Sequence, residues 1–235
     1  MMINLTQQDN IHILRMESAE GNTFDLDFVA AMHKSLDTVE AAGHGPGALV
    51  ITGAGKAFST GLNVGALMGY QPEQLATFAC EIKRLYGRLL NFPLPTIAAI
   101  NGHAFAAGAF LALACDYRIM REDRGWFCIS EVDVGVPINP QVLAMAQAKL
   151  APSVLRDALL SGKRFGGPEC VSLSIADAVC SEDDLIATAI ELITAFSTKD
   201  RSIFTTLKST LYASYATALG AAENTIIPKA GTITL

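Results

Sequence analysis

Short apolar runs alternate with amphipathic stretches along the first half of the chain. Alternating apolar positions predict a strand at Ile11–Met16, and a β-branched run ended by glycine predicts a buried strand at Ala48–Gly53. Apolar residues at helical spacing predict helices at Phe24–Ala42 and Pro72–Leu90. A further buried strand is expected at Thr96–Gly102. This alternation of strands and helices predicts an α/β fold.

The second half of the chain begins with apolar segments and then becomes helical. The alanine content of Ala106–Cys115 favours a buried helix over a strand. The runs at Tyr117–Met120 and Trp126–Ser130 are typical of short strands. From Asn139 the apolar residues recur at helical spacing almost to the end of the chain. The α/β pattern is therefore followed by a helical part.

The composition fits a folded protein with a large core. The chain has 235 residues, of which 51% are apolar and 17% charged, which is too apolar for a disordered chain. This length suits one α/β core, expected over residues 1–180, with a helical segment over residues 181–235. The mean hydropathy of +0.34 is high, so we expect apolar surface to be buried between subunits.

Charge and cysteine content narrow the partners and the compartment. The formal net charge is −6 and no basic patch occurs, so neither nucleic acid nor a membrane is an expected partner. The longest apolar stretch, Ala104–Cys115, is too short to cross a bilayer. Five cysteines without a CxxC spacing predict buried free thiols and no metal site. With no signal-peptide pattern and a final TITL that is not a peroxisomal tripeptide, a cytoplasmic location is expected.

Two familiar nucleophile and phosphate motifs are incomplete in this sequence. GAGKAF lacks a phosphate-loop glycine at Val50 and carries Ala57 after the lysine, which excludes that motif. Lys56 could meet a ligand phosphate or lie solvated in a loop. Ser59 lies in an A-x-S-x-G context, but only His103 follows it and no aspartate separates the two. A serine triad is therefore not expected.

Two turns rich in small residues each follow a buried strand. They lie at Phe58–Asn63 and Asn101–Phe110, and the second runs into the predicted apolar helix. The first N–H groups of a helix lack internal partners and carry the positive end of the helix dipole. Two such donors aimed at one oxygen would form an oxyanion hole. The same small residues could equally serve tight packing of strand against helix.

One carboxylate stands out for acid–base chemistry. Glu131 follows the apolar strand predicted at Trp126–Ser130, and burial there would raise its pKa and make it a better base. Asp133 would share its face if the strand continued. The alternative is a carboxylate at the rim that binds nearby backbone. We expect Asp116, after LALAC, to anchor backbone at the end of a helix.

Several blocks in order resemble the crotonase family, the enoyl-CoA hydratase/isomerase superfamily. They are ALVITGAGKAFSTGLNV, LPTIAAINGHAFAAGAFLALACDYRIM and FCISEVDVGVP, within roughly residues 10–165. The stretch DYRIMREDRGWFCISEVDVGVPIN looks most similar to monofunctional delta-3, delta-2-enoyl-CoA isomerases. The resemblance implies a spiral core of repeated ββα turns with a C-terminal helical segment that packs trimers. It also implies a homotrimer or a dimer of trimers.

The resemblance further implies a set of site residues. The backbone N–H groups of Leu62 and Ala107 would form the oxyanion hole, and Glu131 would be the acid–base group. Hydratases of the family carry a second glutamate where this sequence has Phe110, and phenylalanine cannot activate water. The remaining substrate-binding residues implied by the resemblance are Ser59, Thr60, Gly61, Asn63, Phe110 and Ser130.

These residues predict an isomerase that moves the double bond of a 3-enoyl-CoA to the trans-2 position, as in fatty-acid β-oxidation. Glu131 would take a proton from C2 and return it to C4 of the dienolate. Coenzyme A enters as part of the substrate, and no metal or other cofactor is expected. The alternatives are hydration, hydrolysis or decarboxylation of an acyl-CoA on the same scaffold, or a non-catalytic acyl-CoA-binding subunit.

Overall fold

The computed structural model describes residues 2–18, 21–43 and 45–220. The strands are β1 (Ile3–Gln8), β2 (Ile11–Met16), β3 (Ala48–Gly53), β4 (Ala57–Ser59), β5 (Thr96–Ile100), β6 (His103–Phe105), β7 (Tyr117–Arg121), β8 (Phe127–Cys128) and β9 (Ala178–Cys180). The helices are α1 (Leu26–Ala41), α2 (Val64–Leu67), α3 (Pro72–Leu90), α4 (Ala107–Ala114), α5 (Glu131–Val134), α6 (Pro140–Lys149), α7 (Pro152–Ser161), α8 (Gly167–Ser172), α9 (Leu185–Ser197) and α10 (Arg201–Ala218).

Two sheets organise the described part of the chain. The larger has the strand order β1-β2-β3-β5-β7-β9, and the smaller has the order β4-β6-β8. Only β1 and β2 pair antiparallel; all the other neighbouring strands are parallel. From β3 to β8 successive strands alternate between the sheets, with α3 after the first pair and α4 after the second. The expected α/β fold with repeated ββα turns is confirmed.

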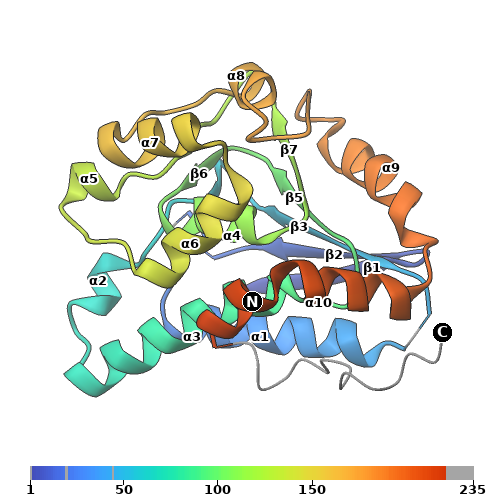
Figure 1. Ribbon diagram of the computed structural model, residues 1–235, viewed down its shortest axis with the longest axis horizontal. Helices are drawn as coiled ribbons and strands as arrows, with labels where there is room; N and C mark the ends of the chain where they lie inside the picture. The colour runs from blue at the N-terminus through green and yellow to red at the C-terminus, as the bar shows by residue number, and fades with distance from the viewer. Residues whose placement is uncertain (1, 19–20, 44, 221–235) are drawn as a thin grey trace.

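Both faces of the larger sheet are buried, which explains the continuous apolar runs of its central strands. On one face, Val50 of β3 and Ile97 of β5 pack with Leu185, Ala189 and Ile193 of α9. The ribbon view has α9 on one side of this sheet and α1, α3 and α10 on the other (Figure 1). Helix α9 belongs to the predicted C-terminal segment, yet it covers a face of the core.

The sequence pattern located long elements better than short ones. The predicted bounds of β2, β3 and α3 agree with the structure, whereas β1 and β9 were not predicted and β4 lies in a stretch expected to be a loop. Strand β9 is three residues long and pairs with β7. Such a short strand is defined by its tertiary partner and leaves little periodicity in the sequence. The final TITL lies outside the described residues.

The predicted strand at Trp126–Ser130 was wrong in its length. Strand β8 ends at Cys128, and Ser130 is the N-cap of α5, whose first residue is Glu131. Glu131 and Asp133 therefore do not alternate along a strand. Asp133 instead approaches the left-handed Gly162 at the end of α7.

All five cysteines are free thiols, as expected, but only three of them are buried. Cys115, Cys128 and Cys170 are buried, but Cys80 is exposed and Cys180 is half-buried. Within the described residues, no helix combines the length and the apolar character that crossing a bilayer requires.

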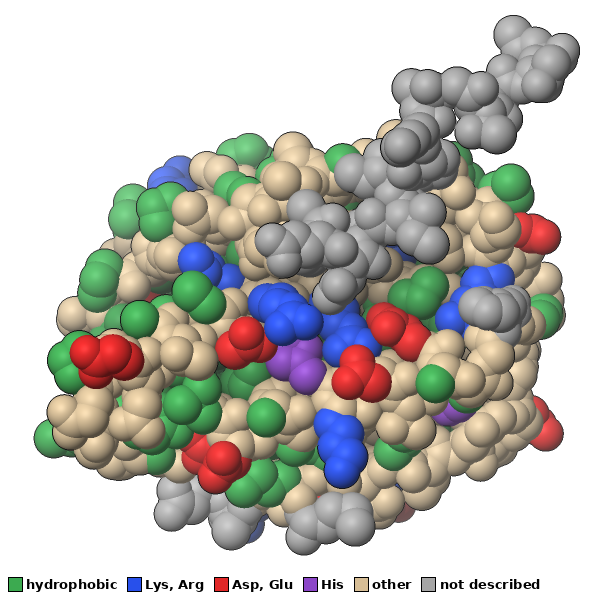
Figure 2. All heavy atoms as spheres, turned by 90° about the horizontal axis from the view of Figure 1, so that it is seen from below, with side chains coloured by type: hydrophobic (Ala, Val, Ile, Leu, Met, Phe, Trp, Pro, Cys, Tyr) green, Lys and Arg blue, Asp and Glu red, His purple; other side chains and the backbone are tan. Residues whose placement is uncertain are grey.

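A surface network of charges links α1 to α3. Arg88 of α3 donates to Asp37 at 2.6 Å and to Glu40 at 2.9 Å on α1, and it also bonds the carbonyl of His33. The face seen in Figure 2 has acidic and basic side chains gathered around a histidine. Exposed ion pairs contribute only ~0–1 kcal/mol each, so the apolar contacts between these helices carry most of their packing energy.

A buried ion pair ties α10 to the core. Lys208 Nζ lies 2.6 Å from Asp116 Oδ2, and the two side chains are only 3% and 13% exposed. The same carboxylate oxygen accepts from the backbone N–H of Thr96 at 2.9 Å and from its hydroxyl at 3.0 Å. Asp116 thus anchors backbone just beyond the end of α4, as the sequence predicted.

Replacing Asp116 with alanine is expected to destabilise the protein by about 3–5 kcal/mol, because Lys208 would remain buried without its counter-charge. Chemical denaturation would measure the change. In the double variant Asp116→Ala/Lys208→Met, removal of the stranded charge should restore part of the loss. A cost below about 1 kcal/mol for Asp116→Ala would mean that this pair behaves like an exposed one.

Candidate active site

The small sheet brings the two small-residue turns together. Strands β4 and β6 are parallel neighbours, so the turns that follow them lie at the same edge. At Gly61, in the first turn, an added Cβ would come within 3.0 Å of Ala106 Cβ and 3.7 Å of Ala107 N. Only a glycine allows this close approach without displacing the second turn.

The residue before each candidate donor has a positive φ. Gly61, before Leu62, has φ +102°, and Ala106, before Ala107, has φ +48°. Because φ and ψ of a residue set the orientation of the peptide after it relative to the peptide before it, these conformations help to direct the N–H groups that follow. A non-glycine residue at positive φ costs of order 1–3 kcal/mol and occurs often at functional sites. Ala106 is such a residue, at the N-cap of α4.

The two candidate N–H groups are free while their neighbours are bonded. Ala106 N–H donates to Cys128 O at 2.9 Å, and Asn63 N–H donates to Phe24 O at 2.9 Å. In the described residues, neither Leu62 nor Ala107 donates a backbone hydrogen bond outside the helices and strands. Ala107 is also the first residue of α4, where the helix offers no acceptor. The arrangement has the donors that an oxyanion hole needs.

Ser59 supports the first turn from inside. Its side chain is fully buried, donates to Asn22 O at 2.8 Å and accepts from Gly61 N–H at 3.2 Å. Asn22 in turn donates to the carbonyls of Ala57 and Phe58. Ser59 can thus shape the site without presenting its hydroxyl to a ligand. The sequence reading missed Asn22, because its bonds span 35 and 36 residues and no motif marks them.

Thr60 and Asn63 lie at the two ends of this turn. Thr60 is exposed, and its hydroxyl makes a long bond to Gly21 O at 3.4 Å. The side chain of Asn63 caps α2 by accepting from Ala66 N–H at 3.2 Å, and it donates to Asp25 at 3.0 Å. Both side chains therefore hold the turn in place, and Thr60 is the one that faces solvent.

Glu131 has a carboxylate oxygen without a partner. Its Oε2 is buried and makes no hydrogen bond to any described residue. Burial raises the pKa of Glu131, and a hydrogen bond from its own backbone offsets part of that rise. Ser130 lies beside it as the half-buried N-cap of α5, with its carbonyl accepting from Asp133 N–H at 3.0 Å. A carboxyl group in this state is suited to accept and return a proton near neutral pH.

Tyr86 and Phe110 pack at the second turn. The Tyr86 hydroxyl donates to Ala107 O at 3.0 Å, and its ring centroid lies 6.4 Å from that of Phe110. Burial first, and then the charge of Glu131, raise the pKa of Tyr86. Phe110 is 4% exposed. A buried aromatic ring thus occupies the α4 position at which the resemblance implies a second glutamate in hydratases.

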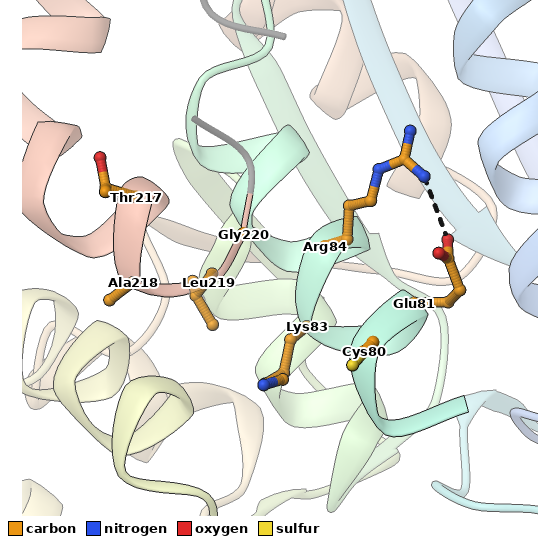
Figure 3. A pocket seen from close by; sticks show the side chains of 8 residues that line it. All are labelled: Cys80, Glu81, Lys83, Arg84, Thr217, Ala218, Leu219 and Gly220. Carbon is orange, nitrogen blue, oxygen red and sulfur yellow. Dashed lines mark hydrogen bonds and ion pairs between the residues drawn. The ribbon is translucent and has the colours of Figure 1, made fainter. Parts of the chain in front are cut away.

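Other candidate groups lie apart from this site. Lys56 is exposed, which agrees with a solvated loop lysine. A hollow of about 200 Å³ between α3 and the end of α10 is lined by Cys80, Glu81, Lys83, Arg84 and residues 217–220 (Figure 3). None of the residues around the two turns or Glu131 lines this hollow.

Known proteins share both this fold and this sequence pattern. A sequence model of the family described as enoyl-CoA hydratase/isomerase matches residues 6–225. Enoyl-CoA delta isomerase 2, peroxisomal, of Arabidopsis thaliana is 32% identical over 230 residues, which cover 93% of this chain and 95% of that protein. A probable enoyl-CoA hydratase of Mycobacterium tuberculosis has a TM-score of 0.87 at 25% identity, over 94% of this chain and 92% of that one.

A further solved structure shows the fold alone. Human mitochondrial delta3-delta2-enoyl-CoA isomerase has a TM-score of 0.87 at 22% identity, over 95% of this chain and 88% of that one. The alternating strands and the paired turns thus define the crotonase fold. The chain belongs to the enoyl-CoA hydratase/isomerase family and is an enzyme of that isomerase/hydratase class.

The close approach of the two turns predicts a cost for adding a methyl group at Gly108. An alanine Cβ there would lie 2.6 Å from Ser59 Cβ and 2.7 Å from Ser59 O. Gly108→Ala should destabilise the protein by about 1–3 kcal/mol, measured by urea denaturation. At Gly45 a Cβ meets nothing within 4 Å and φ is not positive, so Gly45→Ala should change stability by less than about 0.5 kcal/mol. Equal effects at the two sites would contradict the tight contact.

Proposed function

We propose that the protein converts 3-enoyl-CoA thioesters to trans-2-enoyl-CoA. The observation that carries the proposal is Glu131, whose buried Oε2 has no hydrogen-bond partner among the described residues. Three residues after Ala107, helix α4 carries the buried Phe110 and not a second carboxylate. One proton-transferring group, together with two N–H donors that have no acceptor among the described residues, suits a double-bond shift that requires no water.

The reaction proceeds in two proton transfers. The ionised Glu131 carboxylate takes a proton from C2, the C2–H electrons form the C1–C2 double bond of a dienolate, and the carbonyl π electrons move onto the thioester oxygen as negative charge. The N–H groups of Leu62 and Ala107 donate to that oxygen and stabilise it. Glu131 then returns the proton to C4. The oxygen electrons restore the carbonyl, the C1–C2 π electrons form the C2–C3 double bond, and the C3–C4 π electrons form the new C4–H bond. Coenzyme A is carried as part of the substrate, and the balance needs no oxidant, metal or water.

The apolar surroundings favour this sequence of steps over a competing one. Water reaching the dienolate could protonate it at the wrong carbon or exchange the proton of Glu131. Phe110 and Tyr86 are both almost fully buried, so their rings leave little room for water on that side. The raised pKa of Glu131 also reduces the difference between its pKa and that of the C2–H group that it must deprotonate.

Hydration of a 2-enoyl-CoA is the second candidate, because the similar M. tuberculosis protein is named a probable enoyl-CoA hydratase. Hydratase chemistry requires a group to orient water in addition to Glu131, and Phe110 cannot supply it. Crotonyl-CoA distinguishes the two, since hydration removes the enoyl absorbance. An acyl-CoA-binding subunit without catalysis, the remaining alternative, would bind several CoA thioesters with no turnover. A trimeric assembly also remains a proposal, which sedimentation analysis would test.

Glu131→Gln should abolish isomerisation of 3-hexenoyl-CoA, with a loss in kcat of at least ~10²–10⁴-fold and little change in substrate binding. In the wild type, kcat/KM should fall as the pH drops through the pKa of Glu131. Since burial raises that pKa, the fall should occur at a higher pH than for an exposed glutamate. Steady-state kinetics across pH would measure both effects.

The stability of the same variant gives a second readout. Because the pKa of Glu131 is raised in the folded state, protonation of Glu131 stabilises the fold. This stabilisation is lost as the pH rises through the folded-state pKa. Glu131→Gln, which cannot ionise, should therefore be at least as stable as the wild type at neutral pH. Asp133→Asn is the matched control. Asp133 approaches Gly162, so this variant should leave kcat unchanged. A Glu131→Gln protein with the wild-type rate would refute the assignment.

A further inference from the structure

Tyr86 is a buried polar side chain that the proposed reaction does not use. It lies on α3 with 2% of its surface exposed, and its hydroxyl donates to Ala107 O at 3.0 Å. Burying a hydroxyl without a partner costs about 1–3 kcal/mol, so this bond is what makes a tyrosine tolerable here. Phenylalanine would fill the same space without the need for a partner.

The bond joins a long helix to a strained turn. Helix α3 is 19 residues long and buries one face, including Leu85 and Leu89 on either side of Tyr86. Ala107 opens the eight-residue helix α4, directly after Ala106 at φ +48°. The N-cap of α4 has no side-chain hydrogen bond, so Ala106 secures this end of the helix through its backbone, whose N–H donates to Cys128 O at 2.9 Å. The Tyr86 hydroxyl therefore fixes a turn that lacks an ordinary cap.

The same side chain also faces the other parts of the site. Its ring centroid lies 6.4 Å from that of Phe110, one turn further along α4. The charge of Glu131 acts on its hydroxyl. Because that hydroxyl has one proton and gives it to Ala107 O, the proton is not available to the carboxylate.

We propose that Tyr86 is a positioning residue for the oxyanion hole. Its hydroxyl holds the first turn of α4 so that Ala107 N–H points at the thioester oxygen as charge develops there. The inference rests on the proposed function, since it assigns Tyr86 a role in stabilising the same dienolate. A misplaced donor weakens the transition state more than the substrate complex, so the effect should fall on kcat.

Tyr86→Phe keeps the ring and removes the hydroxyl. We expect kcat for 3-hexenoyl-CoA to fall about 3- to 10-fold, as for the loss of one hydrogen bond, with KM within about twofold of the wild type. Tyr212→Phe is the matched control: its hydroxyl bonds Lys149 Nζ at 2.8 Å, between α10 and α6. That variant should lose some stability and keep its kcat. Circular dichroism would first establish a temperature at which every variant is folded.

A second variant and a second probe complete the test. Tyr86→Trp offers an indole N–H to the same carbonyl, so if it folds it should retain more of kcat than Tyr86→Phe. Acetoacetyl-CoA reports on the hole without turnover, because its enolate absorbs in the near ultraviolet. Tyr86→Phe should bind it with a smaller enolate fraction than the wild type does at the same saturation.

The outcomes separate the two proposals. Wild-type kcat and wild-type enolate absorbance in Tyr86→Phe would overturn the positioning role and leave the isomerase proposal standing. A change confined to KM would overturn the role as well, because it would reflect substrate binding alone. A wild-type protein that neither isomerises 3-hexenoyl-CoA nor enolises bound acetoacetyl-CoA would overturn the proposed function, and the inference with it.

Discussion

The whole site depends on the close approach of two backbone turns that leaves one free N–H on each. Gly61 and Ala106 both adopt a positive φ, and the N–H of the next residue has no backbone acceptor among the residues that the structure describes. For alanine this conformation is costly, so the surrounding structure must hold it. The parallel pairing of β4 with β6 provides that constraint, because it brings the ends of the two strands to one edge. The alternation of strands between two sheets is what creates such an edge.

The rest of the fold reinforces this contact from several directions. Ser59 and Asn22 fix the first turn through buried hydrogen bonds, and Tyr86 reaches the second turn from α3. Glu131 depends on a different device, a short helix that begins where β8 ends. Its raised pKa follows from burial without a partner, a cost that a purely structural carboxylate would avoid by finding a donor. The buried Glu131 carboxylate thus lowers the stability of the fold at the position where the proposed reaction needs a proton-transferring group.

The sequence predicted those parts of the molecule that depend on local pattern. The long amphipathic helix Pro72–Leu90 and the buried strand Ala48–Gly53 were predicted with their bounds, because periodicity and apolar runs define them. The three-residue strands β4 and β9 were missed, since their pairing comes from distant segments. Glu131 was expected to follow a strand that ends at Ser130, whereas the structure ends β8 at Cys128 and begins α5 at Glu131; its catalytic role stays a prediction. The support from Asn22 and Tyr86 left no local signal, because each acts across the fold.

The central claim is that Leu62 N–H and Ala107 N–H receive the thioester oxygen while Glu131 faces the carbons that exchange a proton. A crystal structure of the protein with a non-reactive 3-enoyl-CoA analogue would test it most directly. The account predicts a thioester oxygen about 2.7–3.1 Å from both nitrogens. It also predicts C2 and C4 on the side of Glu131, with its carboxylate about 3–3.5 Å from C2. A thioester oxygen bonded to neither nitrogen, or a Glu131 turned away from the acyl chain, would contradict it.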